Sequence, residues 1–378
     1  MKISDEHDLQ LLLELTAIPT AAGREHRVIN YIEKWVIARD DLTLQTDEHG
    51  NLLITQKRKK DEGGPAPVFL TAHLDHPAFV VRRVIDNENV ELEFRGGVRD
   101  NCFPEKEIEI FDRSDRIYRG KIVDFQETEP FRIVTAQLYE ETSQIEPGDI
   151  GRWYLSGTGG QPELKGDLFH SPACDDLAGV AAAMIVLNNL RKRDGFEHVG
   201  LLLTRAEEIG FVGAIGAAKS ESVSKDVRLI CLEMSRSFND SPIGAGPILR
   251  VGDFTGVFSR NLTNQFSQIL REHEKQNPDF RWQRKLMPGG TCEATVFAEY
   301  GYPTACFCLP LGNYHNMIDA SLPEGSPPTG GIGAEFISIN DFRGLIETLT
   351  ICIGQIDSKT VSLRSKLEAR FAKGKHVL

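Results

Sequence analysis

Apolar residues recur at a helical spacing in the first part of the chain and then give way to a strand. Residues 5–39 carry leucine, isoleucine, valine and aromatic side chains at that spacing, with Pro19 and Gly23 at the break between two predicted helices. Further on, the continuous apolar run 68–72 predicts a buried strand that ends at His73. This segment therefore predicts helices packed against a sheet.

The pattern changes between about Pro77 and Gly166. Short runs of alternating apolar and polar residues, such as 90–94, 107–110 and 131–134, are separated by glycine, aspartate and asparagine. The pattern predicts no helix between them. A series of short strands of this kind is typical of a small β-barrel or sandwich.

Strands and helices alternate again in the rest of the chain. The pattern predicts helices at 177–190, 210–219 and 261–275, strands at 199–204, 227–232 and 304–309, and a basic helical tail from Lys359. Continuous apolar strands that alternate with helices predict a mostly parallel sheet covered on both faces. We therefore expect an α/β fold with a mostly parallel, doubly wound sheet built from residues 1–76 and 167–378, and a small all-β barrel domain, 77–166, inserted into one of its loops.

Charge and hydropathy exclude several classes of partner. The 378 residues carry a net charge of -12, which argues against a general nucleic-acid surface or an anionic membrane surface. No apolar stretch is long enough to span a bilayer. The first seven residues lack the apolar core of a signal peptide, so we expect a cytoplasmic protein.

Residue types that bind metals follow the ends of the predicted strands. In chain order they are His73, Asp175, the pair Glu207-Glu208, Glu233 and His315. In open α/β sheets, sites form beyond the carboxyl ends of the strands. A catalytic pair of metal ions needs imidazoles, a bridging carboxylate and a free carboxylate that takes a proton from water, and this series supplies all of them.

Each of these residues also has an ordinary structural explanation. Asp75 lies on the same side of an extended chain as His73, so we expect its carboxylate to accept the second ring N–H of that histidine. Helix capping explains Asp176 and leaves Asp175 free to bridge two cations. Two glutamates directly after a buried strand repel each other unless metal ions or protons neutralise them. His315 is the weakest indication of a metal site, because a histidine in a loop is usually a surface residue.

Four short motifs together give a resemblance to a known family. They are Ala-Cys-Asp-Asp at 173–176, Glu-Glu-Ile-Gly-Phe-Val-Gly-Ala at 207–214, Gly-Gly-Thr at 289–291 and Gly-Tyr-Pro-Thr at 301–304. The chain resembles the co-catalytic dinuclear metallo-aminopeptidases of the zinc exopeptidase superfamily, in particular the glutamyl and tetrahedral aminopeptidase family. The resemblance covers most of residues 1–320, including the inserted β domain.

The resemblance implies a role for each candidate residue. His73, Asp175 and Glu233 would hold one metal ion, and Asp175, Glu208 and His315 would hold the other. Glu207 would be the general base, and Asp75 would orient His73. The implied cofactor is two divalent metal ions, zinc first, although mixed nitrogen and oxygen ligands also suit cobalt or manganese. The resemblance further implies peptide substrates and a homo-oligomer.

The chain departs from the family pattern at four places, one of which is the segment around His315, where the family's Arg-Tyr-x-His is missing. The chain has His76-Pro77-Ala78 where the family usually has Glu-Ile-Gly, Cys292-Glu293 in place of Asp-Ala, and Glu233 in place of aspartate. The leading hypothesis is a metal-dependent aminopeptidase that removes N-terminal residues from peptides. The alternatives are an N-acyl amino acid deacylase on the same dinuclear site and a non-catalytic protein on a peptidase fold.

Overall fold

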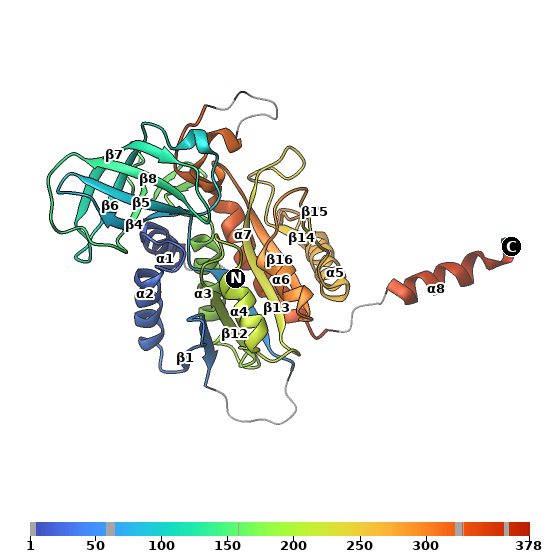
Figure 1. Cartoon of the computed structure of the whole chain (residues 1–378). Helices are drawn as coiled ribbons and strands as arrows, with labels where there is room; N and C mark the ends of the chain where they lie inside the picture. The colour runs from blue at the N-terminus through green and yellow to red at the C-terminus, as the bar shows by residue number, and fades with distance from the viewer. Residues whose placement is uncertain (1–4, 58–64, 158, 322–326, 328, 359–362) are drawn as a thin grey trace.

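The chain folds into an α/β body with a β-barrel beside it (Figure 1). The figure shows a computed structural model, which describes residues 5–57, 65–157, 159–321, 327, 329–358 and 363–378. No helix within these ranges combines the length and the apolar character that a bilayer crossing requires. The predicted fold class is confirmed.

An eight-stranded sheet forms the centre of the body. Its order is β1 (Leu42–Thr46), β2 (Leu52–Gln56), β12 (Val199–Thr204), β3 (Val68–His73), β13 (Arg228–Arg236), β16 (Thr304–Leu311), β14 (Ile248–Gly252) and β15 (Gln283–Leu286). The four central strands, β12, β3, β13 and β16, are parallel, whereas β2 and β14 pair antiparallel with this group. The carboxyl ends of four neighbouring strands therefore lie along one edge of the sheet.

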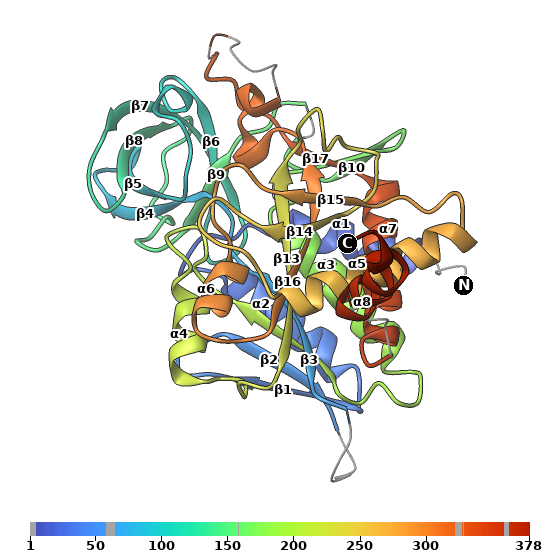
Figure 2. The ribbon, with the colours of Figure 1, turned by 90° about the vertical axis from the view of Figure 1, so that its right-hand side faces the viewer.

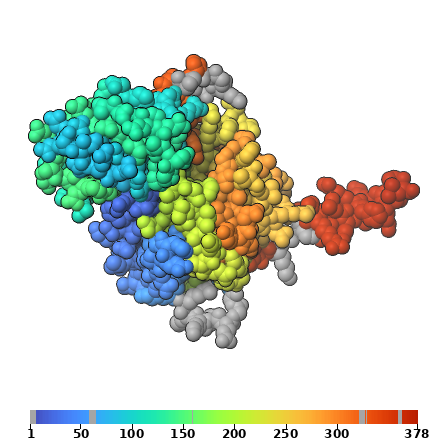
Figure 3. Space-filling view, viewed as in Figure 1, coloured from blue at the N-terminus to red at the C-terminus, as the bar shows by residue number. Residues whose placement is uncertain are grey.

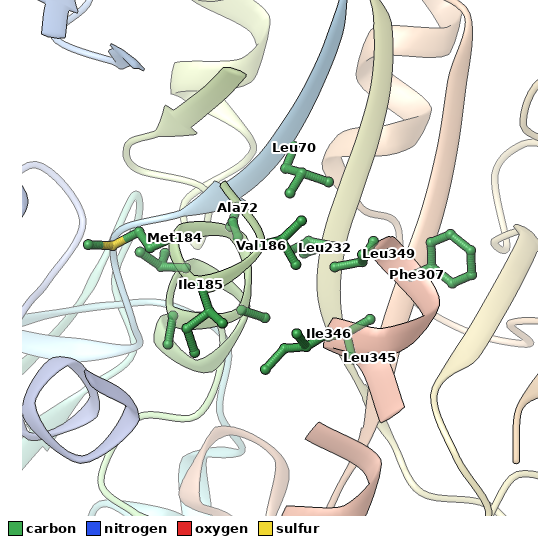
Figure 4. Close-up of a cluster of buried hydrophobic side chains, with 14 of the residues drawn as sticks. Leu70, Ala72, Met184, Ile185, Val186, Leu232, Phe307, Leu345, Ile346 and Leu349 are labelled. Carbon is green, nitrogen blue, oxygen red and sulfur yellow. The ribbon is translucent and has the colours of Figure 1, made fainter. Parts of the chain in front are cut away.

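Helices cover both faces of this sheet. The helices are α1 (Asp5–Ala17), α2 (His26–Ile37), α3 (Leu177–Leu190), α4 (Val212–Ser220), α5 (Arg260–Gln276), α6 (Glu293–Glu299) and α7 (Ile339–Gln355). On one face, α3 and α7 lie side by side on the sheet, where Ile185 and Val186 pack beside Leu232 and Leu345 (Figure 4). On the other face, α4 and α6 pack together in a separate apolar cluster.

The inserted region forms a closed antiparallel barrel, which stands beside the sheet (Figure 2). Its strands, in barrel order, are β4 (Ala78–Val84), β5 (Asn89–Arg95), β8 (Arg132–Leu138), β7 (Ile117–Gln126), β6 (Glu107–Phe111) and β9 (Ile150–Trp153). Phe79, Phe94 and Trp153 fill it, with the rings of Phe79 and Trp153 4.6 Å apart in an edge-to-face contact. The barrel therefore has a hydrophobic core of its own, against which Met317, Ile332 and Ala334 of the body pack.

A small sheet and a terminal helix complete the molecule. The strands β10 (Glu163–Lys165), β11 (Leu168–Ser171) and β17 (Glu335–Ser338) form a three-stranded sheet outside the barrel. Strand β10 precedes the predicted domain boundary near residue 166 but pairs with β11, outside the barrel. The placement of this boundary therefore stays a prediction. Residues 359–362 of the predicted tail lie outside the described ranges, and α8 (Leu363–Gly374) follows them. Short 3-10 turns lie at Asp100–Cys102, Tyr314–Asn316, Ile318–Ser321 and Lys375–Val377.

Candidate metal centre

The structure brings all five predicted segments together at one edge of the sheet. His73 is the last residue of β3, the pair Glu207-Glu208 follows β12, and Glu233 lies within β13. Asp175 lies two residues before the start of α3, and His315 lies in the turn that follows β16. Because β12, β3, β13 and β16 are neighbours in the sheet, their ends converge on one place.

Asp175 lies between the two histidines. Its Oδ1 is 3.4 Å from His73 Nε2, and its Oδ2 is 3.6 Å from His315 Nε2. Glu208 Oε1 is 3.5 Å from the same His315 nitrogen, and Glu207 Oε2 is 3.9 Å from His73 Nε2. One carboxylate thus directs a different oxygen toward each imidazole, as a ligand that bridges two cations must.

Several buried oxygens at this place have no hydrogen-bond partner among the described residues. They are Asp175 Oδ1, Glu208 Oε1 and Glu233 Oε1. Buried polar atoms are almost always paired, because an unpaired one costs about 1–3 kcal/mol. Unpaired carboxylate oxygens beside imidazole nitrogens are the donor set that a divalent cation of the zinc, cobalt or manganese type takes. The residues therefore fit a metal.

The grouping of the ligand atoms differs in part from the implied sets. Two groups have ligand atoms that all lie within 4.8 Å of one another: His73, Asp175 and Glu208, and His73, Glu207 and Glu233. The close contacts of His315 with Asp175 and Glu208 match the second implied set. The first implied set, which joins His73, Asp175 and Glu233, does not recur as one such group, so the division of ligands between two ions stays a proposal.

The site holds more negative charge than it can carry without cations. Burial and nearby carboxylates raise the pKa of Glu208 to about 8 and that of Glu233 to about 7. Burial opposes the charged form of His315, but Glu208 and Asp175 together raise its pKa to about 10. The metal-free site therefore retains protons that metal ions would displace.

Asp75 contacts both His73 and the glutamate pair. The ring Nδ1 of His73 is 3.1 Å from the backbone carbonyl oxygen of Asp75, while the nearer carboxylate oxygen is 3.6 Å away. The carboxylate instead accepts hydrogen bonds of 3.0 Å from the backbone N–H groups of Glu207 and Glu208. Asp75 therefore orients His73 through its main chain and the glutamate pair through its side chain.

Asp176 has the predicted cap position, at the N-terminus of α3, but not the side-chain hydrogen bond of a cap. Its carboxylate accepts the backbone N–H of His73 at 3.3 Å instead, and the peptide bond between Asp175 and Asp176 is cis. Both aspartates therefore serve the site.

The sequence interpretation missed Glu335, whose carboxylate joins the segment 174–175 to the turn at His315. Glu335 is fully buried on β17, and its Oε2 accepts the N–H groups of Cys174 and Asp175 at 2.8 and 3.0 Å. Its Oε1 accepts the N–H of His315 at 2.8 Å. The signal was available, because a glutamate in an apolar strand is rarely buried without a partner.

Two of the departures from the family pattern are buried beside the site. His76 lies between the carbonyl oxygen of Asp175, 2.5 Å from Nδ1, and the amide oxygen of Asn316, 3.0 Å from Nε2. Glu293 opens α6 and accepts the hydroxyl of Thr204 at 2.8 Å, and burial raises its pKa to about 8. His76 therefore contacts the metal centre through Asp175, and Glu293 contacts the end of β12 through Thr204.

A pocket of about 390 Å³ opens from the metal centre. Beyond the five candidate ligands and Glu207 it is lined by Met234, Ser235, Arg236, Phe238, Arg250, Met287, the segment 288–291 and Tyr314. Arg250 is held in place, because it donates to the carbonyl of Met234 and to Ser235. The Nε of Arg236 is buried and has no hydrogen-bond partner among the described residues.

Solved structures of low sequence identity share this fold. An aminopeptidase of Desulfurococcus kamchatkensis has a TM-score of 0.72 at 18% identity, covering 94% of this chain and 99% of that one. A TET aminopeptidase of a marine sediment archaeon, Thaumarchaeota archaeon SCGC AB-539-E09, has a TM-score of 0.74 at 16% identity, with 93% and 98% covered. The TET1 peptidase of Pyrococcus horikoshii, which can assemble into a tetrahedron or a large octahedral shell, has a TM-score of 0.69 at 18% identity, with 91% and 98% covered.

A family model identifies the chain more directly. The model of the M42 glutamyl aminopeptidase matches residues 50–321, which is more than half of the chain and includes all five segments of the metal centre. The resemblance seen in the four sequence motifs is thereby confirmed. The chain belongs to the M42 glutamyl aminopeptidase family and is a metal-dependent aminopeptidase.

Proposed function

We propose that the enzyme works with two divalent metal ions, zinc first among them, bridged by Asp175. The observation that carries this proposal is the carboxylate of Asp175, whose two oxygens face two different histidines. His73 and Glu233 would complete one metal site, and Glu208 and His315 the other. Two divalent ions held by these residues would supply an activated water and polarise the scissile carbonyl.

Glu207 is the proposed general base. Its carboxylate is buried and reaches within 3.9 Å of His73 Nε2, and the backbone N–H of Glu207 is held by Asp75. From there Glu207 takes the proton of the attacking water and delivers it to the nitrogen of the leaving amine. In the metal-free site, burial raises the pKa of this carboxyl group.

We propose that the pocket accepts an acidic N-terminal side chain. Arg236 and Arg250 line it, and the carboxylates that share the pocket belong to the metal centre. A buried Arg236 Nε without a partner gains a hydrogen bond when a substrate carboxylate enters. Met234, Phe238 and Met287 supply apolar walls for the methylene groups of such a side chain.

We also propose that the enzyme is a homo-oligomer. The support is the fold shared with the TET1 peptidase of Pyrococcus horikoshii, which can assemble into a tetrahedron or a large octahedral shell. Light scattering coupled to size-exclusion chromatography tests this proposal directly, and a single-chain mass would contradict it.

The catalytic proposal separates two neighbouring glutamates. Glu207→Gln should keep both metal ions and lose roughly 10²–10⁴-fold in turnover, which is the usual contribution of a general acid–base group. Glu208→Gln should instead lose bound metal. Metal content by mass spectrometry and hydrolysis of aminoacyl anilides measure the two effects, with N-acyl amino acids assayed in parallel. Unchanged turnover in Glu207→Gln, or hydrolysis of N-acyl substrates alone, contradicts the proposal.

A further inference from the structure

Helix α8 lies outside the compact α/β body. Figures 1 and 3 show it projecting away from the α/β body. A hydrogen bond joins α8 to this body: Lys366 Nζ donates to Gln268 Oε1 of α5 at 3.3 Å. None of the described residues of α8 is buried.

One side of α8 carries a row of large apolar side chains. Leu363, Leu367 and Phe371 are 46%, 51% and 63% exposed. Residues four apart lie one above another on a helix, so these three form a single row, which we call the apolar row. An unpartnered row with this spacing is the pattern by which a helix docks into a groove.

Positive charge flanks the apolar row on both sides. At about 100° per residue, Arg364 and Arg370 lie about 60° to either side of Leu367. Residues 363–378 contain five lysines and arginines and one glutamate, a net charge of +4 in a chain whose total is -12. The remaining residues therefore carry -16, and the arm and the body attract each other.

We propose that α8 is an intermolecular arm, whose apolar row docks on the body of a second copy of this chain. The acidic body of a neighbouring copy complements the cations that flank the row, whereas a second α8 repels it. A membrane is the poorer partner, because its binding calls for a broad apolar face and the body would be repelled by anionic lipid. The inference rests on the proposed self-association but not on the catalytic roles.

Paired substitutions in the full-length chain test the arm. Leu367→Glu with Phe371→Glu should shift the mass measured by light scattering to a smaller species. Ala369→Glu adds a negative charge on the opposite face of α8 and should leave the assembly intact. Raising the ionic strength from about 0.1 M to about 1 M shortens the Debye length from about 10 Å to about 3 Å and should weaken the docking.

Lysine cross-linking shows where the arm lies. In the band of twice the chain mass, Lys373 should be linked to a lysine of the body, and this link should be missing from the single-chain band. An assembly that persists in the double variant, with arm links in the single-chain band alone, overturns the arm and leaves self-association standing. A single-chain mass for the unaltered protein overturns both. Sedimentation of the unaltered protein with phosphatidylglycerol vesicles, abolished by the double variant, overturns the arm in favour of a membrane.

Discussion

Individual residues decide the chemistry of this centre, and one of them, Asp75, acts through atoms that the sequence does not specify. A carboxylate two residues after a strand-end histidine predicts contact between the two side chains. In the structure the main-chain carbonyl of Asp75 is the nearer hydrogen-bond partner of the His73 ring. The carboxylate of Asp75 accepts hydrogen bonds from the glutamate pair. Residue spacing defines which groups come close, but not which atom of each group makes the bond.

At the residue scale, Arg236 tests the proposed substrate preference. Arg236→Met should lower kcat/KM for glutamyl substrates by about 10–100-fold, because a hydrogen bond to a charged group contributes about 1.5–3 kcal/mol. Alanyl and leucyl substrates should change little. Arg284 is exposed, so Arg284→Met is a matched control. An equal loss with all three substrates would mean that Arg236 supports the site without selecting the substrate.

Elements fix the distances between the ligands. The apolar strand runs and the alternation with helices are local features, so the parallel sheet and the barrel could be predicted from the sequence. The pairing of β17 with β11 joins residues about 165 positions apart and could not. For this reason the sequence interpretation found the ligands on β3, β12 and β13 but missed Glu335 on β17.

At the element scale, Glu335→Gln tests how β17 holds the site. The glutamine amide keeps one acceptor oxygen where the carboxylate has two, so buried N–H groups of Asp175 or His315 lose their partner, at a cost of about 1–3 kcal/mol. We expect weaker metal retention during dialysis against a chelator and a lower melting temperature. Glu163→Gln, on β10 of the same small sheet, is the control. Metal retention equal to that of the unaltered protein would assign Glu335 a purely structural role.

The loop after His315 has an anchor of its own. Asp319 accepts hydrogen bonds from Thr329 and Gly330, and the bond from the Thr329 hydroxyl, with these backbone bonds, lowers the pKa of Asp319. A lowered folded-state pKa contributes stability above the unfolded value near 4, and that stability is lost as the pH falls. Asp319→Asn should therefore lower the free energy of unfolding by about 1–3 kcal/mol at neutral pH. The difference should shrink below about pH 4; a constant difference across pH would contradict this account.

At the scale of the whole molecule, metal binding and folding are linked through the buried charge. In the metal-free protein, Glu208 and Glu293 have folded-state pKa values of about 8, above the ordinary value of 4.5. Between these pH values the folded chain binds protons that the unfolded chain has released, so stability falls as the pH rises. The raised pKa of His315 acts in the same direction.

Chelator-treated protein should therefore melt at a lower temperature near pH 8 than near pH 6. Added zinc should raise the melting temperature more at the higher pH, because fewer protons compete for the ligands. Differential scanning calorimetry of the two forms measures both effects. A metal-free protein that is more stable near pH 8 would show that these carboxylates do not share one buried site.

The most direct test of the central claim is anomalous diffraction from crystals of the zinc-loaded enzyme. Asp175 as a bridging ligand predicts two zinc peaks about 3.5–4 Å apart. Each zinc ion should be coordinated by a different oxygen of that carboxylate, one ion beside His73 and the other beside His315. A single peak, or a pair that Asp175 does not bridge, would contradict the account.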